Sequence, residues 1–242
     1  MKLKRLTFAF VAALLACGAQ AQTTKGTVAL TGKLGYTHNK VASEAEKVAY
    51  TNNSENHSYT FAPGVGVFVK DNLEIGASVS LNSYKYEHSN EQPSYPGTYT
   101  SSHQEDTREK HAGVYARQYK FLTQRFAAHV TLSAGLGSSR SETVNSSYNQ
   151  SSYSNTHDNL EKTIFSTIAI SPGLSFFASE KVGISVHLGA LRYSRRDFEA
   201  VRKSTSLNYE PQQYEGKHQS NVLELDFSSM NLNFGLTYFI GR

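Results

Sequence analysis

The chain contains no tryptophan and a single cysteine, Cys17. One thiol has no partner within the chain, so an internal disulfide framework is excluded. Beyond the N-terminal segment, no stretch approaches the roughly 18 apolar residues of a membrane-spanning helix. Proline is scarce beside glycine, with 5 residues against 17, whereas tyrosine and phenylalanine are abundant. These proportions favour an all-β chain, in which apolarity is spread over short alternating segments and escapes a window average.

The N-terminus has the organisation of a secretory signal. A basic start is followed by an apolar run and by a small-residue cleavage motif that ends at Ala21. This pattern predicts a signal peptide at 1–21 and one mature domain at 22–242. The same run also fits a lipoprotein motif in which Cys17 would be lipidated, and the sequence leaves both possibilities open.

Charge gives no indication of nucleic-acid binding. Removal of the signal peptide would take away three basic residues and lower the formal net charge from +4 to +1. The pI of about 9.0 is therefore partly a property of the signal segment. We expect no nucleic-acid partner.

The C-terminal end alternates strictly from Met230 onward, and a period of two places alternate residues on opposite faces of a strand. One set is Met230, Leu232, Phe234, Leu236, Tyr238 and Ile240, and the other is Asn231, Asn233, Gly235, Thr237 and Phe239. A large apolar outer set with a mostly small, polar inner set is typical of a transmembrane β-barrel. We expect this strand to close the barrel by pairing with the first strand near 27–37. A soluble ligand-binding barrel, with its large apolar residues inside, is the remaining alternative.

The same alternation recurs along the mature chain. Eight strands are predicted at 26–38, 58–70, 73–87, 109–122, 126–137, 160–178, 182–196 and 221–242. Tight turns are expected at 70–72, 123–125 and 179–181, and long polar loops at 39–57, 88–108, 139–159 and 197–217. The faces of the fourth strand stay unassigned. In the eighth strand the apolar phase slips between Phe227 and Met230, which predicts a β-bulge.

The predicted fold is all-β: an eight-stranded antiparallel up-and-down transmembrane β-barrel with short periplasmic turns and four long extracellular loops. Eight strands enclose a lumen only wide enough for side chains, so no aqueous channel is expected.

The mature chain resembles the small eight-stranded outer-membrane β-barrel proteins of Gram-negative bacteria, the OmpX/OmpA-barrel type. The resemblance rests on the strand-turn-strand units at 63–73, 119–123 and 171–177 and on the aromatic C-terminal segment. It implies that Tyr238, Phe239 and Ile240 form the signal for the barrel assembly machinery, although Gly241 and Arg242 follow them, whereas the family usually ends on the aromatic residue. It also implies a location in the cell outer membrane.

Four ionisable residues fall in the inward phase of the predicted strands: Lys33, Glu74, His129 and His187. Arg117 and Gln118, on the strand whose faces are unassigned, are candidates for a further member. An unpaired charge in a narrow interior is costly, so these groups are predicted to form an internal polar network. A gated ion path is the functional alternative.

Other chemistry finds little support. Histidines cluster in or beside the predicted loops, at His57, His88, His103, His111, His157 and His218, but no H-x-x-H or C-x-x-C spacing accompanies them, so no metal site or cofactor is predicted. Two sets of residues offer Ser, His and an acid for a lipid-modifying enzyme, namely Ser83, Glu87 and His88, and Ser154, His157 and Asp158. No specific catalytic spacing supports either set.

The sequence therefore predicts a monomeric, non-enzymatic outer-membrane protein with a structural and surface-interaction role. Its expected partners are outer-membrane lipids and lipopolysaccharide, the barrel assembly machinery, and an extracellular partner bound by the loops. A narrow porin-like channel is the first alternative and an outer-membrane lipid-modifying enzyme the second.

Overall fold

The structure is a computed structural model of the 242-residue chain. It describes residues 23–45, 50–93, 97–149, 153–206, 209–226 and 233–241. The expected signal peptide, with Cys17 and the cleavage site at Ala21, lies outside the described residues.

The described chain is built from antiparallel strands. They are β1 (Val28–Ala45), β2 (Tyr50–Lys70), β3 (Leu73–Pro93), β4 (Thr98–Phe121), β5 (Phe126–Asn149), β6 (Tyr153–Phe177), β7 (Val182–His187), β8 (Ala190–Ser206), β9 (Tyr209–Asp226) and β10 (Asn233–Ile240). In these residues no helix has the length and apolarity to cross a membrane. The all-β, up-and-down organisation expected from the alternation is confirmed.

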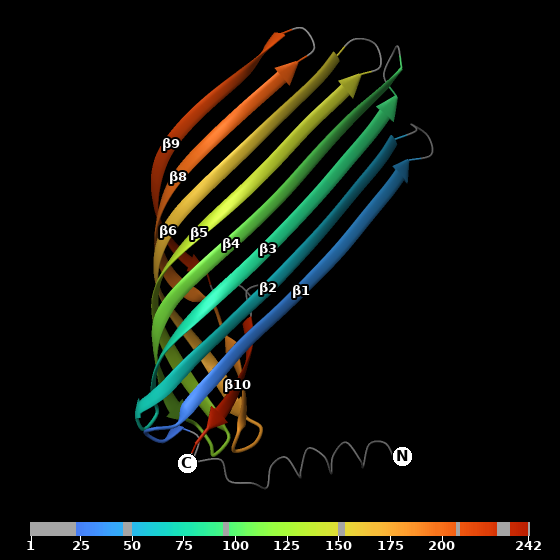
Figure 1. Ribbon diagram of the computed structural model, residues 1–242. Helices are drawn as coiled ribbons and strands as arrows, with labels where there is room; N and C mark the ends of the chain where they lie inside the picture. Colours follow the sequence, from blue (N-terminus) through green and yellow to red (C-terminus); the bar gives the residue numbers. More distant parts are fainter. Residues whose placement is uncertain are drawn as a thin grey trace, which may run out of the picture.

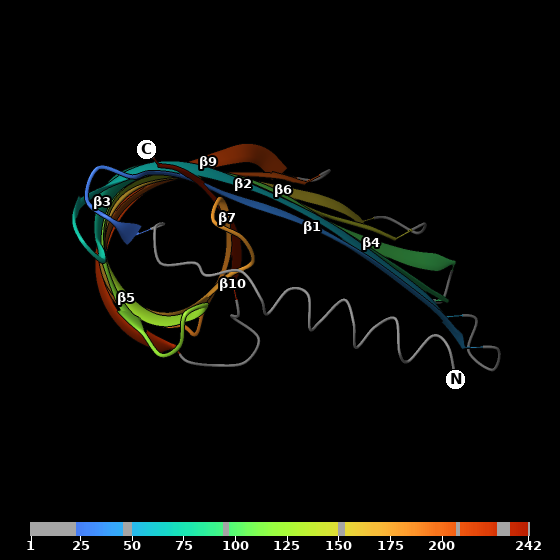
Figure 2. The same cartoon turned by 90° about the horizontal axis from the view of Figure 1, so that it is seen from below.

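Eight of these strands close into a ring, in the order β1 to β7 and then β10. Figure 2 shows this ring from below. β10 closes it by pairing with β1, from Val28 opposite Ile240 to Gly32 opposite Leu236. The sequence expectation that the last strand pairs with the first is confirmed.

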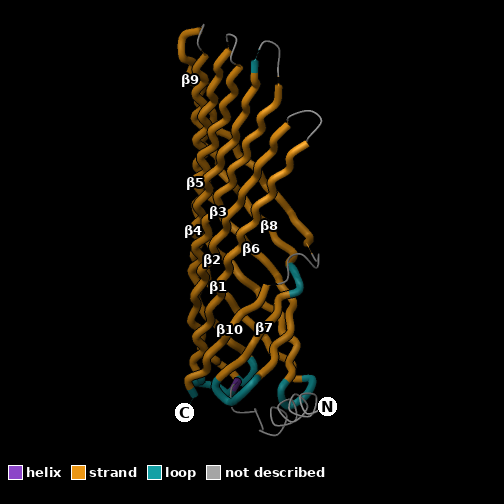
Figure 3. Tube along the Cα trace, turned by 90° about the vertical axis from the view of Figure 1, so that its right-hand side faces the viewer, coloured by secondary structure: helices purple, strands orange, loops and turns teal. Residues whose placement is uncertain are grey.

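Above the ring the strands continue as an open sheet. β8 and β9 extend it from β6, and within the described ranges β1 beyond Gly32 pairs only with β2. Figures 1 and 3 show the long strands rising from the ring to one side. We call the part formed by the segments 39–57, 88–108, 139–159 and 197–217 the upper sheet.

The upper sheet overturns one expectation, because these four segments were predicted to be irregular loops. In the structure they form strand hairpins. The outermost described pair is Ala45 opposite Tyr50 in the first hairpin and Pro93 opposite Thr98 in the second. Backbone hydrogen bonds continue here although the apolar alternation stops. When both faces of a sheet are polar, burial imposes no pattern on the side chains, so the sequence loses its period while the ladder persists. Pro93 is the last residue of β3.

The seventh predicted strand, 182–196, is broken into β7 and β8. On β6, Ile170 pairs with Leu191 of β8 and Gly173 pairs with His187 of β7. Two residues of β6 lie between these pairs, but three residues lie between them on the opposite segment, so that segment holds one extra residue. Gly189 has a φ of +112° at this break. Pro172, which has no N–H to donate, lies opposite on β6 and accepts a hydrogen bond from the Leu188 N–H. The extra residue reverses the alternation, so the outward phase passes from even to odd positions.

The last predicted strand is likewise described as two strands, β9 and β10. Leu223 and Leu225 are exposed in β9, and Phe234 and Leu236 are exposed in β10, so the outward phase changes from odd to even between them. The bulge expected between Phe227 and Met230 itself lies outside the described residues. The three tight turns are confirmed, and Asn72 in the first has a positive φ of 66°.

Glycines on the inner face make room for large inward side chains. A Cβ on Gly76 of β3 would lie 2.5 Å from both Tyr115 Cζ and the Val65 carbonyl oxygen. On the outer face of β1, a Cβ on Gly32 would meet nothing within 4 Å. Inner-face glycines therefore set how closely Tyr115 and its neighbours can pack.

We expect Gly76→Ala to lower the free energy of unfolding by about 1–3 kcal/mol, the usual cost of overpacking. Urea titration of the protein folded in detergent micelles measures this change. The matched control is Gly32→Ala, for which the loss should stay within about 0.5 kcal/mol. Equal effects at the two positions would contradict the close packing over Gly76.

Candidate functional site

The ring interior at the short-turn end is filled by four aromatic rings, Phe68, Tyr119, Phe177 and Phe239, which we call the aromatic plug. They come from β2, β4, β6 and β10, which are alternate strands of the ring. Neighbouring ring centroids lie 5.7 to 6.3 Å apart around the whole set. The four side chains are at most 4% exposed, so no water-sized passage runs beside them. Small residues on intervening strands, Ala29 and Ala127, complete this layer.

A buried charged group lies against the plug. Glu74 of β3 is 0% exposed, and its two carboxylate oxygens accept hydrogen bonds from the Tyr115 hydroxyl at 2.6 Å and the Tyr119 hydroxyl at 2.9 Å. Arg117 of β4 places Nη1 3.6 Å from Glu74 Oε2. Arg117 also donates to the hydroxyls of Tyr119 and Thr131. The negative charge is thus paired and hydrogen-bonded, as a buried carboxylate must be.

The histidines lie beside this group. His129 of β5 forms a 3.0 Å hydrogen bond between its Nδ1 and the Ser175 hydroxyl of β6. Its ring contacts His187 of β7 edge-on, with centroids 5.1 Å apart, and also contacts Tyr119. A Cβ on Gly173 would collide with the His129 ring, so this glycine provides the space for it. The arrangement fills the interior, although His129 Nε2 is buried there without a hydrogen-bond partner.

The structure brings three of the four predicted interior residues together. Glu74, His129 and His187 lie in one cluster linked through Tyr119 and Arg117. Lys33 lies in the inward phase of β1 and is partly buried. The cation that forms the ion pair with Glu74 is Arg117. Sequence reasoning missed Tyr115, Tyr119, Thr131 and Ser175 as members. The sequence shows that Tyr115 and Tyr119 share a strand phase with Arg117. The faces of that fourth strand were ambiguous, because it carries large residues in this phase and small apolar residues in the other.

The outer face of the ring carries an exposed apolar band. Leu136, Ile164 and Val114 are 69%, 67% and 61% exposed, values that a protein in water avoids over a continuous surface. On β5 the band runs along alternate residues from Phe126 to Leu136, and on β2 from Tyr59 to Val69. This length matches the roughly 9–11 residues of a tilted transmembrane strand.

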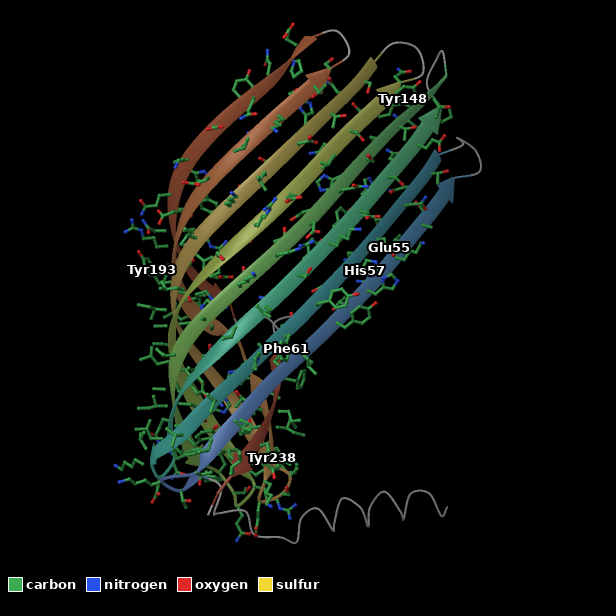
Figure 4. All side chains as sticks on the ribbon, viewed as in Figure 1. Glu55, His57, Phe61, Tyr148, Tyr193 and Tyr238 are labelled. Carbon is green, nitrogen blue, oxygen red and sulfur yellow. The ribbon has the colours of Figure 1, made fainter. Side chains whose placement is uncertain are left out.

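Aromatic side chains border the band. Figure 4 labels Phe61 and Tyr193 on the outer face and Tyr238 near the short-turn end. Tyr36 and Tyr59 pair across β1 and β2 with centroids 5.1 Å apart. Tyr84, Tyr86 and Tyr115 occupy the inward phase of β3 and β4, and Tyr115 is buried.

The C-terminal segment divides between the two faces. Tyr238 and Ile240 are exposed on the band, whereas Phe239 is 3% exposed within the aromatic plug. Phe239 thus has a structural role in filling the ring. The assembly signal assigned to these three residues stays a prediction.

Ion pairs follow immediately above the band on the same outer face. They are Lys40 with Glu55, Lys85 with Glu87, Arg108 with Asp106, Arg140 with Glu142, Arg195 with Asp197, and Lys217 with Glu199. On β1 to β5, β8 and β9, the side chains of the outer face change from apolar to charged at the base of the upper sheet. It marks the level at which the surroundings of the outer face are expected to change from apolar to aqueous.

The residue sets considered for catalysis are not brought together. Glu87 and His88 are neighbours in β3, and His157 and Asp158 are neighbours in β6, so each pair points to opposite faces. Among the other histidines, His111 stacks on Phe165 and His218 stacks on Phe198. His88 lies directly opposite His103, and Asn145 separates His103 from His157 in the same cross-strand row. The ring of His57 stacks on that of His38.

Comparison with known proteins gives little. No protein-family model matches the chain, and no curated protein matches it. A solved outer membrane channel from Pseudomonas putida F1 is similar at 8% identity, over 91% of this chain and 97% of that one, with a TM-score of 0.18. A likeness of this size supports no conclusion about fold or function.

We predict that Glu74→Ala destabilises the protein by about 3–5 kcal/mol, because Arg117 would then be buried without a carboxylate. The free energy of unfolding in detergent micelles measures the loss. The double variant Glu74→Leu with Arg117→Met should recover part of it, since an apolar pair replaces a buried ion pair at little cost. Glu87→Ala, which breaks an exposed ion pair on the same strand, is the control and should cost at most about 1 kcal/mol. A loss no larger than that of the control would exclude a structural role for the buried carboxylate.

Proposed function

We propose that the protein is an outer-membrane β-barrel with a structural and surface-interaction role, in which the ring spans the bilayer and the upper sheet projects from the cell. The observation that carries this proposal is the inside-out distribution of the ring: an exposed apolar outer face around a polar and aromatic interior. A closed ring leaves no unpaired edge in lipid, which is the condition for a β-structure to span a membrane.

The upper sheet supports an interaction role. It is polar on both faces, and in the part of the chain that the structure describes β1 pairs there only with β2 and β9 only with β8. Exposed Tyr148 and Tyr214 lie among Ser, Asn and Gln side chains, a composition that suits contacts with other molecules. The partners we propose are outer-membrane lipids and lipopolysaccharide around the band, the barrel assembly machinery during insertion, and an external molecule bound by the upper sheet. Within this proposal the protein acts as a monomer.

No observation on the described residues favours either alternative function, the narrow channel or the lipid-modifying enzyme. A channel needs an open lumen, and the aromatic plug and the Glu74 cluster occupy it. A lipid-modifying enzyme needs Ser, His and an acid within hydrogen-bond reach. The two candidate sets from the sequence are divided between opposite faces. We therefore propose a non-enzymatic role.

Membrane insertion is tested by fractionation and gel mobility. We expect the protein in the outer-membrane fraction, with a band that shifts when the detergent sample is boiled, because a closed ring stays folded until it is heated. A soluble periplasmic protein without a shift would overturn the proposal.

A charge on the band provides a sharper comparison. Leu132→Arg should reduce the amount of protein that shows heat-modifiable gel mobility, since an arginine facing lipid costs about 2–4 kcal/mol near the bilayer centre. Val144→Arg changes the same face of the same strand, β5, but in the upper sheet, and should leave that amount unchanged. Equal behaviour of the two variants would contradict the proposed membrane level.

Conductance separates the structural role from a channel. The purified protein in a planar bilayer is expected to give no steady single-channel current, because Phe68 and Phe177 are 0% and 1% exposed inside the ring. Steady openings would show that the plug moves and would favour the channel.

A further inference from the structure

Two histidines that are 19 residues apart in sequence meet at the base of the upper sheet. His38 of β1 and His57 of β2 are directly opposite each other on the outer face. Their rings stack at a centroid distance of 4.5 Å, and the two Nδ1 atoms are 3.2 Å apart. Sequence spacing gave no sign of this pair, because the β1–β2 register creates it.

A third side chain orients His57. Glu55 lies two residues away on the same face of β2, and its Oε1 is 2.9 Å from His57 Nε2. Figure 4 shows Glu55 and His57 next to each other above Phe61. Hydrogen bonding to the carboxylate holds the proton of a neutral His57 on Nε2, which leaves the Nδ1 lone pair toward His38. This is the carboxylate–histidine arrangement that orients imidazole ligands in metal sites.

The separation of the two nitrogens suits a shared cation. With metal–nitrogen bonds of about 2.0–2.1 Å, two imidazole ligands are about 2.9 Å apart at a right angle and about 3.3 Å apart in a tetrahedral site. The observed 3.2 Å lies between these values. The near-parallel rings must turn slightly for both lone pairs to converge, and their exposure on a surface strand allows this.

The surroundings allow a cation and leave positions for water. Lys40 neutralises the other carboxylate oxygen of Glu55 at 3.4 Å, while on β3 Lys85, opposite His57, is paired with Glu87 at 2.7 Å. At the level of His38, β1 pairs only with β2 among the described residues, so no other described strand covers its second edge.

We propose that His38 and His57 bind a divalent transition-metal ion such as Zn²⁺ or Ni²⁺ through their Nδ1 atoms, with Glu55 as the positioning residue for His57. Imidazole ligands favour these ions over Ca²⁺ and Mg²⁺, which prefer oxygen. The site lies on the outer face at the base of the upper sheet, away from the interior cluster. It does not depend on the proposed role of the protein in the membrane.

The test is a calorimetric titration of untagged full-length protein in detergent micelles with ZnCl₂. His38→Gln and His57→Gln should each bind one Zn²⁺ fewer than the wild type. Glu55→Gln should keep the site with an affinity about ten- to a hundredfold weaker, as expected when the partner of a liganding histidine is lost. Lowering the pH should also weaken binding, because protons compete for the imidazole nitrogens.

The matched control is His218→Gln, which removes a histidine of β9 at the base of the upper sheet and outside the pair, and should leave this Zn²⁺ site intact. Heat-modifiable gel mobility confirms that each variant is folded. The proposal is overturned if the wild type binds no Zn²⁺, or if His38→Gln and His218→Gln bind it with the same stoichiometry and affinity. The first result would assign the 3.2 Å contact to a hydrogen bond between the rings alone, and the second would assign the bound metal to other histidines.

Discussion

The packing of side chains inside a narrow ring is the constraint on which the structure depends. Alternate strands supply the four rings of the aromatic plug, and intervening strands supply Ala29, Ala127 and Gly183. Eight strands leave room for one layer of large side chains at a time, so each large residue requires a small neighbour. The same rule explains Gly76 beneath Tyr115 and Gly173 beneath His129. Because these contacts cross the ring, they couple strands that share no backbone hydrogen bonds.

Electrostatics follow from that packing. The carboxylate of Glu74 is enclosed, so its charge is matched by Arg117 and its oxygens are satisfied by two tyrosine hydroxyls. The tyrosines also belong to the aromatic layers, and Tyr119 joins the plug to the charged cluster. Filling the lumen and satisfying the charge are therefore carried out by the same side chains. This arrangement stabilises a closed structure and gives no path for solutes at the level of the plug.

The chemistry of the outer surface changes along the strands, from the ring to the upper sheet. The apolar band surrounds the ring, ion pairs follow at its upper border, and the upper sheet is polar on both faces. The surface chemistry changes at this border while the strands continue through it. The border is also where cross-strand register brings His38 against His57. Features proposed for contact with metal ions and external molecules thus lie on strands that the buried interior holds in place.

The sequence by itself determined the antiparallel alternation, the short turns, the pairing of the last strand with the first, and the inward placement of Glu74, His129 and His187. A period of two is imposed wherever the two faces of a strand have different surroundings, and these features lie in that part of the chain. Only the tertiary structure decided the rest. The upper strands carry no apolar period because both faces are polar, the break at Gly189 depends on Pro172 in a neighbouring strand, and the Arg117–Glu74 and His38–His57 pairs depend on register between strands. The alternation along one strand determines which face each residue lies on. The residue opposite it on the neighbouring strand is determined only when hydrogen bonds align the two strands.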